Sequence, residues 1–151
     1  MSTFLSGRDI PVIIMHIKGK PKTMQSNPVY DDLLKDINNF FKKQIKFAKS
    51  NGIVRDNIIL DPGIGFGKTF SHNLKIINNL KDLCNLGHPI MIGTSRKAFI
   101  GDILDATPKE RIEGTIASTV ASVINGANIV RVHDVKEIKK AIMVTEKILD
   151  S

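Results

Sequence analysis

The stretch IILDPGIGFGKT, residues 58–69, decides how the rest of this sequence is interpreted. A short apolar run ends at Asp61 and continues into a loop in which glycines alternate with other residues. The loop is not a G-x-x-x-x-G-K-[ST] phosphate loop, because Pro62 stands where that pattern needs its first glycine. The glycines are spaced two and two, so G-x-G-x-x-G does not fit either. A carboxylate at the end of a buried strand, before a glycine-rich loop, indicates instead an active-site position in an α/β protein.

Three further apolar runs, at residues 11–16, 89–95 and 128–134, resemble the run at 57–62. Each is short, rich in Ile and Val and nearly continuous, as expected of a parallel strand buried on both faces. Helical patterns separate the runs, at about 28–50, after Ser71 and up to Gly87, near 97–104, at 107–125, and from 134 onward. This alternation predicts one domain over residues 1–151, built on a parallel sheet with right-handed crossovers.

Local signals mark where the longer helices begin. Asn27 followed by Pro28 fits an N-cap and a first-turn proline. The second helix is expected to start after Ser71, which acts as its cap. The segments TPKE at 107–110 and DVKE at 134–137 fit capping boxes for the last two helices.

Two architectures fit this order of elements: a small open doubly-wound sheet, or half of a (β/α)8 barrel, which takes about 250 residues in full. The strand ends favour the barrel, because polar side chains follow all four apolar runs. They are His16, Asp61, the group Ser95, Arg96 and Lys97, and the pair Arg131 and His133. In a barrel these ends converge on one face. We therefore predict an α/β chain whose parallel β/α units form half of a TIM barrel.

The composition excludes several other classes of protein. Hydrophobic residues make up 42% and charged residues 25%, and no apolar run nears the ~20 residues of a membrane span. The formal charge of +7 favours an anionic ligand, but the lysines are scattered, and one tyrosine without any tryptophan argues against nucleic acid binding. The single cysteine, Cys84, excludes an internal disulfide, and no signal peptide is visible, so a cytoplasmic location is expected.

Asp61 is the most informative residue, because Pro62 and Gly63 present its carboxylate at a sharp turn. Such a carboxylate suits a partner with two parallel N–H donors, such as an aminopyrimidine edge or an arginine. The alternatives are a helix cap or a salt bridge to Arg131. His16, at the end of the first run, is expected to be a hydrogen-bonded structural residue. The His and carboxylate residues lack the spacing of a metal-ligand set.

The other strand ends allow two interpretations each. Residues 94–97, TSRK, can bind an anion or a ring oxygen, or can begin a solvated helix. Alternation places Arg131 and His133 on one face of the last strand, either as an anion clamp or as an internal ion pair with Asp134. Phe66, flanked by glycines, suits stacking on an aromatic ligand or packing under the barrel lip.

Four motifs then give the chain a resemblance: IIMHIKGKPKTM, LDPGIGFGKTFSHN, IGTSRKAFIG and IVRVHDV. In this order they resemble the C-terminal half of the dihydropteroate synthases, pterin-binding transferases of folate biosynthesis, from about Asp9 onward. The resemblance implies a (β/α)8 barrel of which this chain supplies strands five to eight. It also implies the reaction, in which p-aminobenzoate displaces diphosphate from 6-hydroxymethyl-7,8-dihydropterin diphosphate.

The resemblance further implies a role for each motif residue. The implied pterin ligands are Asp61, Lys97, Met15 and Arg96; p-aminobenzoate is bound beside Ser95, Gly65, Phe66 and Lys68; and diphosphate is bound by Arg131 and His133. The implied catalytic residues are Lys97, Arg131 and His133.

The same resemblance implies that the N-terminal half of the family is missing here, and Met1–Gly7 resembles the tail of a preceding helix. That half carries the asparagine associated with Mg²⁺, so magnesium is the expected cofactor, with no metal ligand in this chain. Four strands alone leave two sheet edges unpaired. We therefore expect a fragment, or a chain that completes a barrel with a complementing half-barrel, and a homodimer by default. Small-molecule substrates are the other expected partners, without nucleic acid or membrane.

Two other functions compete with this one. A non-catalytic pterin-binding module would keep Asp61 and Lys97 but lack the metal and p-aminobenzoate elements. A corrinoid-linked methyltransferase domain is disfavoured by the pair Arg96 and Lys97 and by the pair Arg131 and His133, because methyl transfer leaves no diphosphate to bind.

Overall fold

Four short parallel strands form the centre of the structure, a computed structural model that describes residues 8–151. They are β1 (Val12–Met15), β2 (Ile58–Asp61), β3 (Met91–Ile92) and β4 (Ile129–Val130). β1 pairs with β2 and β3 pairs with β4, and a bridge between Leu60 and Ile90 joins the two pairs. The strands therefore lie in chain order, as in a β/α barrel, whereas a doubly-wound sheet reverses its order at a switch point. The expectation for Met1–Gly7 lies outside the described residues.

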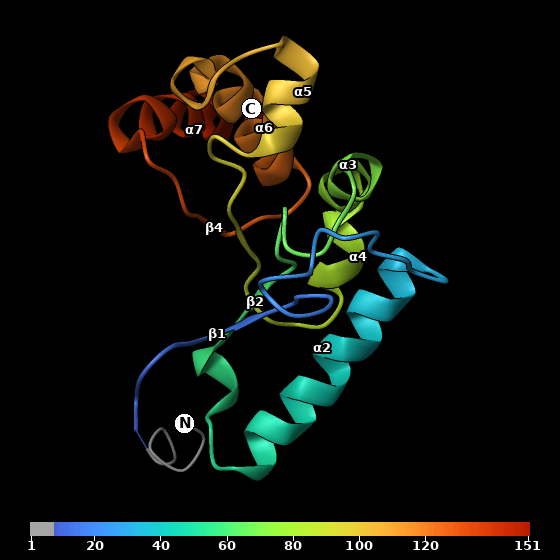
Figure 1. Ribbon diagram of the computed structural model, residues 1–151. Coiled ribbons are helices and arrows are strands. Elements are labelled where there is room, and N and C mark those ends of the chain that lie inside the picture. Colours follow the sequence, from blue (N-terminus) through green and yellow to red (C-terminus); the bar gives the residue numbers. More distant parts are fainter. Residues whose placement is uncertain (1–7) are drawn as a thin grey trace.

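Helices connect and cover these strands. The α-helices are α2 (Leu33–Ser50), α3 (Phe70–Asn78), α4 (Leu80–Cys84), α5 (Ala98–Leu104), α6 (Ile112–Ile124) and α7 (Val135–Leu149), with 3-10 turns η1 (Arg55–Asn57) and η2 (Pro108–Glu110). Figure 1 shows α5, α6 and α7 gathered at one end of the molecule and α2 at the other, with α3 and α4 between them. Among residues 8–151, no helix is both long and apolar enough to cross a membrane.

The first long helix begins later than predicted. Asp32, not Asn27, is the N-cap of α2, and its carboxylate accepts a hydrogen bond from the backbone N–H of Lys35 at 3.2 Å. Asn27 has a φ of 52°, in the left-handed region, which does not begin a right-handed helix. The predicted start at Pro28 was therefore wrong. The segment between β1 and α2 instead contacts the glycine-rich loop, as described below.

The second predicted helix starts earlier and is broken. Thr69 caps α3 and forms a capping box with His72, so the prediction of Ser71 as the cap was wrong. The helix stops at Asn79, whose side chain donates to the backbone carbonyl of Lys75 at 2.7 Å, and α4 follows directly. Such competition between an asparagine side chain and the backbone favours a break in a helix.

The two predicted capping boxes have different outcomes. Thr107 and Glu110 do form one, but it caps the short turn η2, and α6 starts only at Ile112. Asp134 is the N-cap residue of α7 but makes no side-chain cap hydrogen bond. The second box was therefore wrong, because the Asp134 carboxylate is used elsewhere, in an ion pair with Arg96.

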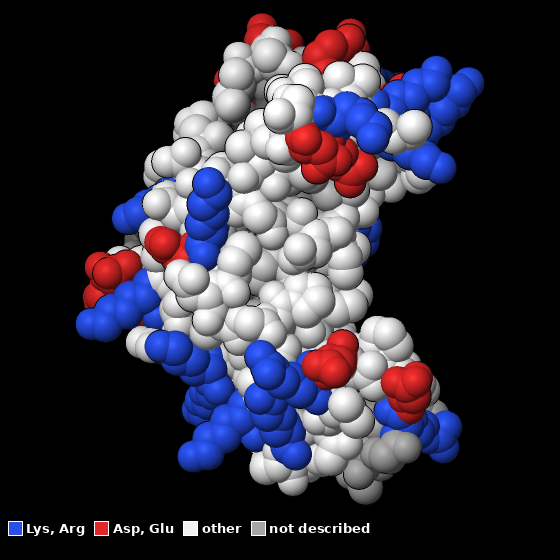
Figure 2. Space-filling model, turned by 180° about the vertical axis from the view of Figure 1, so that it is seen from behind, with Lys and Arg blue, Asp and Glu red and all other residues white. Residues whose placement is uncertain are grey.

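The strands bury one face under the helices and turn the other face away from them. Ile58, Leu60 and Ile92 belong to the main core beneath the helices. Alternation then turns the neighbouring residues to that other face, and the two at the sheet edges are exposed: Ile13 on β1 by 49% and Ile129 on β4 by 36%. Figure 2 shows an outline hollowed on one side, between the two ends of the molecule. This second face is thus open along both edges of the sheet.

Candidate functional site

The predicted site residues gather at the C-terminal ends of the strands. Met15 and Asp61 are directly paired in the β1–β2 register. A cavity of about 310 Å³ opens beside β3 and β4 and is lined by Phe66, Gly93, Ser95, Lys97, Arg131, Val132 and His133. A second cavity of about 290 Å³ includes Gln25, Gly65, Lys68, Asn73 and again Lys97 in its lining. Lys97 therefore stands between the two cavities.

The carboxylate of Asp61 is almost completely buried, with 2% exposure. It accepts a hydrogen bond from the backbone N–H of Gly63 at 2.7 Å. Burial raises the pKa of Asp61, and the Gly63 hydrogen bond and the charges of Arg131 and Lys68 act in the opposite direction. Among residues 8–151 this carboxylate forms neither a salt bridge nor a helix cap. The side chain therefore keeps acceptor capacity for a ligand.

Two glycines bring the loop after Asp61 against the loop after β1. Gly63 has a φ of 69°, and a Cβ added there would lie 2.0 Å from the carbonyl oxygen of His16. Gly67 has a φ of 66°, and its added Cβ would lie 2.2 Å from the carbonyl oxygen of Lys18. The glycines are therefore needed for close backbone packing and for left-handed geometry, not for holding phosphate.

Beneath this loop, Lys68 and His16 form a buried pair. The Lys68 Nζ lies 3.0 Å from His16 Nδ1 and donates to the carbonyl oxygen of Phe66 at 3.0 Å. Burial, together with the charges of Lys68 and Lys18, lowers the pKa of His16 to about 3. Burial also lowers the pKa of Lys68 to about 7, which the charge of Asp61 opposes. His16 is therefore neutral near pH 7 and accepts the lysine hydrogen bond.

The segment between β1 and α2 holds the same loop from the outside. The Tyr30 hydroxyl donates to the carbonyl oxygen of Gly67 at 2.8 Å, and the Gln25 side chain donates to that of Gly65. From the other side, the Asn73 side chain accepts from the Gly65 N–H at 2.8 Å. These contacts satisfy the polar backbone of the loop and explain why residues before Leu33 are not helical.

Phe66 and Lys97 meet at the boundary of the two cavities. The Lys97 Nζ lies 4.4 Å from the centroid of the Phe66 ring, within cation–π range. Burial lowers the pKa of Lys97, the neighbouring Arg131 lowers it further, and Asp61 raises it. Phe66 is half-buried and keeps part of its surface available. The pair can thus present a flat ring and a cation to one ligand.

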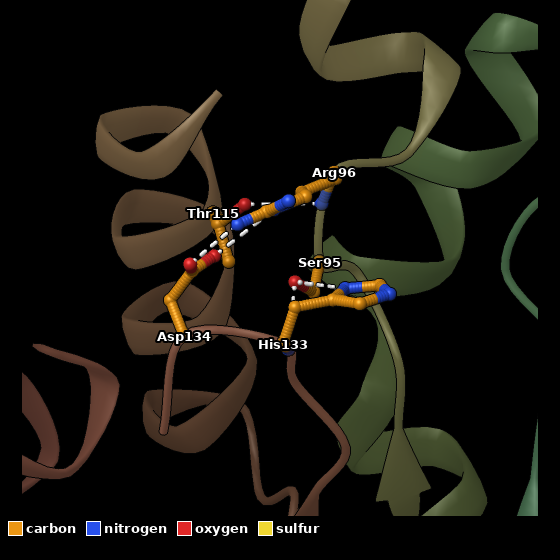
Figure 3. A network of polar contacts seen from close by, with 5 residues as sticks. All are labelled: Ser95, Arg96, Thr115, His133 and Asp134. Carbon is orange, nitrogen blue, oxygen red and sulfur yellow. Dashed lines mark hydrogen bonds and ion pairs between the residues drawn. The ribbon is translucent and has the colours of Figure 1, made fainter. Parts of the chain in front are cut away.

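The ends of β3 and β4 are joined by a polar network, drawn in Figure 3. Ser95 Oγ lies 2.9 Å from His133 Nδ1 and accepts the His133 backbone N–H at 3.2 Å. Because Nδ1 is bonded to Ser95, Nε2 is the ring nitrogen left to face a ligand.

The same network fixes Arg96. Its guanidinium forms a bidentate contact with Asp134, at 2.6 Å and 3.1 Å, and its backbone N–H donates to Thr115 at 3.1 Å (Figure 3). The predicted ion pair with Asp134 thus exists, but with Arg96 and not with Arg131 or His133. Arg96 has a φ of 57° and lines neither cavity.

Arg131 has a different environment. It is exposed, lines the larger of the two cavities and has no salt bridge within residues 8–151. A Cβ at Gly93 would lie 3.5 Å from the Arg131 guanidinium, so the glycine leaves room beside it. His133 is also exposed and lines the same cavity. The strand β4 ends at Val130, so the prediction that Arg131 and His133 lie within the last strand was wrong, although both line the same cavity.

The predicted site residues are therefore only partly assembled. The four residues assigned to p-aminobenzoate are divided: Ser95 and Phe66 line one cavity, whereas Gly65 and Lys68 line the other. Met15 and Asp61 pair on adjacent strands but line neither cavity.

Sequence reasoning missed three supporting residues. Arg111 donates to the backbone carbonyls of Arg96 and Lys97 at 3.0 and 3.3 Å, Thr115 accepts from Arg96, and Asn73 holds the glycine loop. No local pattern marks Arg111 or Thr115, because their partners lie 14 to 19 positions away.

Across residues 8–151, no cluster of three or more His, Cys, Asp or Glu side chains could hold a metal ion. The candidate site offers one buried carboxylate, Asp61, among the cations Lys68, Lys97 and Arg131. Mg²⁺ needs several oxygen ligands, so these residues do not fit a magnesium site by themselves.

Comparison with known proteins gives this geometry its context. A family model described as "Pterin binding enzyme" matches residues 1–133. The chain is 42% identical over 142 residues to the dihydropteroate synthase of Escherichia coli K12 and 39% identical over 150 residues to that of Bacillus subtilis. These matches cover 94% and 99% of this chain. The chain spans about half the length of the curated relatives it matches, 50% in both cases.

Solved structures agree with the sequence matches. The dihydropteroate synthase of Yersinia pestis, in complex with a sulfonamide drug, superposes with a TM-score of 0.91 at 41% identity, over 93% of this chain and 51% of that one. The enzyme from Clostridium difficile, in the presence of pteroic acid, gives 0.90 at 43% identity, over 98% and 54%. These likenesses and the strand order indicate the α/β TIM-barrel fold.

Proposed function

Because this chain belongs to the family of pterin binding enzymes, we propose that it forms the pterin- and diphosphate-binding part of a dihydropteroate synthase, a transferase. Its β1 to β4 correspond in this proposal to strands five to eight of the barrel. Both exposed sheet edges then receive a complementing half-barrel, from the same polypeptide or from a second chain. Ile13 and Ile129, exposed on the interior face, would pack against that half.

The proposed reaction is a substitution at the methylene carbon of 6-hydroxymethyl-7,8-dihydropterin diphosphate. The amine nitrogen of p-aminobenzoate forms a new C–N bond to this carbon while the C–O bond to diphosphate breaks. The amine loses a proton, and diphosphate leaves with the electron pair of the broken bond. The protein must therefore hold the planar ring so that the attacking amine nitrogen, the methylene carbon and the leaving oxygen of diphosphate are aligned.

Asp61 binds the pterin ring in this proposal. A carboxylate with free acceptor capacity matches the two parallel N–H donors of the aminopyrimidine edge. Met15, paired with Asp61 in the sheet, packs on the ring, and Lys97 contacts it from the cavity side. Arg96 remains a predicted cover for the ring, although its guanidinium is already bound to Asp134.

Arg131 and His133 bind the diphosphate. Arg131 supplies a permanent positive charge, and the His133 ring, oriented by its contact with Ser95, directs Nε2 as a donor to the anion. Because charge builds up on the leaving oxygens, these groups stabilise the transition state more than the ground state. Arg131, His133 and Lys97 are thus the proposed catalytic residues.

The proposed p-aminobenzoate binding site is formed by Ser95, Gly65, Phe66 and Lys68. Phe66 offers its ring to the aromatic amine, and Lys68 holds the Phe66 carbonyl from below. Magnesium remains the proposed cofactor and would help to neutralise the diphosphate. Its protein ligand would come from the complementing half, since the described residues do not form such a site. A homodimer is the default assembly.

The observation that carries the proposal is the buried Asp61 carboxylate beside the cationic cavity. We would titrate a pterin into the chain by fluorescence and compare Asp61→Asn. Asparagine keeps an oxygen for the Gly63 N–H but replaces the other acceptor with an NH₂ donor. Binding should weaken by at least about tenfold, as expected for the loss of a charged hydrogen bond. Asp56→Asn, in η1 before the same strand, is the control and should bind like the wild type.

Turnover separates the two candidate functions. With the complementing half added, a synthase forms dihydropteroate and diphosphate, and Arg131→Ala should reduce that rate. Saturable pterin binding without turnover under the same conditions would favour the non-catalytic pterin-binding module. Equal pterin affinity in wild type and Asp61→Asn would contradict the proposed role of Asp61.

A further inference from the structure

A second cationic pocket lies at the opposite end of the strands. It has a volume of about 380 Å³ and is lined by Lys42, Ile45, Lys46, Lys49, Arg55, Leu86 and His88. We call it the basal pocket. Arg55 and His88 precede β2 and β3, whereas Asp61 and Ser95 lie at or beyond the C-terminal ends of the same strands. The basal pocket is therefore separate from the candidate site.

The cations of the basal pocket are not neutralised by the protein. Within residues 8–151 the single salt bridge joins Arg96 and Asp134, so none of Lys42, Lys46, Lys49 and Arg55 is in an ion pair. Figure 2 shows Lys and Arg side chains gathered over the region of α2. This concentration of positive charge attracts anions.

The pocket also contains side chains that are held in place by the protein. Arg55 donates to the carbonyl oxygen of Gly87 at 3.3 Å, which anchors its guanidinium at the rim. His88 is buried, with 6% exposure, and lines the pocket. Ile45 and Leu86 supply an apolar wall.

The spacing of the lysines indicates the size of the anion. Lys42, Lys46 and Lys49 lie at i, i+4 and i+7 on one face of α2, which spans about 10 Å along the helix axis. A chain of phosphates can extend along this face and contact all three lysines at once.

We propose that the basal pocket binds a polyphosphate group, either free or as part of a nucleotide. The phosphate chain lies along Lys42, Lys46 and Lys49 and ends at Arg55. In a nucleotide, the base packs on Ile45 and Leu86. This site goes beyond the proposed synthase activity and does not depend on it.

The test is calorimetric titration of inorganic tripolyphosphate into the Arg131→Ala variant, in which the candidate diphosphate site is weakened. We expect saturable binding with one ion per chain. Adding Lys42→Glu and Lys46→Glu should weaken it at least tenfold. The matched control adds Lys136→Glu and Lys140→Glu, which have the same spacing and charge change on α7, and should retain binding.

A second readout reports on His88 directly. Burial lowers the pKa of His88, and the charges of Lys49 and Arg55 lower it further. An anion bound beside Lys42, Lys46, Lys49 and Arg55 offsets those charges, so the pKa of His88 measured by NMR should rise on addition of tripolyphosphate. ATP in place of tripolyphosphate distinguishes the two sources: tighter ATP binding that is lost in Leu86→Ala identifies a nucleotide.

Two results would overturn the proposal. One is equal weakening by the two charge-reversed pairs, which would mean general attraction to a basic protein. The other is the absence of saturable binding in Arg131→Ala together with an unchanged pKa of His88.

Discussion

The two ends of the candidate site differ in how far they are removed from water. At the β1–β2 end, Asp61 and Lys68 are 2% and 3% exposed and are held by hydrogen bonds to loop backbone. At the β3–β4 end, Arg131 and His133 are exposed in an open cavity. A buried, fixed carboxylate suits recognition of one ring, because its geometry is set before the ligand arrives. Exposed cations suit an anion that must enter and leave.

The difference also separates stability from binding. Groups at the buried end should affect both folding and pterin binding, because the same contacts serve both. Groups at the open end should affect anion binding with little change in folding. Four substitutions test this division, in decreasing order of expected effect.

Gly63→Ala should have the largest effect. The new Cβ would lie 2.0 Å from the His16 carbonyl oxygen and would force a φ of 69° on alanine. We expect a loss of more than about 3 kcal/mol in unfolding free energy, because both a steric clash and backbone strain are introduced. Urea unfolding would measure it. Gly52→Ala is the control: Gly52 also has a positive φ, 77°, but is exposed, so only the strain of about 1–2 kcal/mol should appear. Equal losses would show that the loops are not in close contact.

Lys68→Met should have a smaller effect that depends on pH. Burial lowers the pKa of Lys68 to about 7 in the folded chain, below its ordinary 10.5. Between these values the unfolded chain binds more protons, so the stability of the wild type should rise from about pH 7 toward pH 10. The variant should lack this rise. At pH 9 its free energy of unfolding should be lower by about 2 kcal/mol, because two hydrogen bonds of a neutral amine are lost. Lys140→Met, at an exposed lysine, should keep the wild-type slope. If the stability of Lys68→Met rose with pH as steeply as that of the wild type, the lowered pKa of the buried Lys68 would be contradicted.

Arg131→Ala should leave unfolding unchanged but weaken binding of inorganic diphosphate by about 10- to 100-fold, the range for a charged hydrogen bond. The measurement is calorimetric, in a Lys42→Glu and Lys46→Glu background that removes the basal pocket. Unchanged affinity would place the anion elsewhere. A large loss of stability would mean that Arg131 is structural, and the division between the two ends would fail.

Asp134→Asn should have the smallest effect. The bidentate pair with Arg96 is partly exposed, with 35% and 22% of the side chains accessible, and such pairs contribute little. The Arg96 hydrogen bond lowers the pKa of Asp134, so the contribution is present above the ordinary carboxyl pKa and disappears as the pH falls below it. A thermal melt of the variant should therefore match the wild type more closely in acid than at neutral pH.

The parts of the fold and site that follow from periodic patterns could be predicted from the sequence. Apolar runs located the four strands, and the polar residues after those runs include the lining residues Ser95, Arg131 and His133. Features set by long-range contacts could not be predicted. The Lys68–His16 pair joins residues 52 positions apart, and no local pattern marks it.

Helix starts failed for the same physical reason. Asp134 satisfies a local capping pattern, but Arg96, 38 positions earlier, binds its carboxylate instead. Asn27 fits an N-cap by residue type, whereas contacts from Gln25 and Tyr30 to the glycine loop keep that segment irregular. Tertiary contacts therefore decide between alternatives that local preference leaves nearly equal in energy.

The exposed isoleucines on β1 and β4 have a consequence for the life of the chain in a cell. Apolar side chains beside unpaired strand edges are the surface that chaperones hold and that drives misassembly. A chain whose edges stay uncovered would be bound or degraded, and one whose edges are covered would persist. We therefore expect its abundance to follow the supply of whatever completes the sheet.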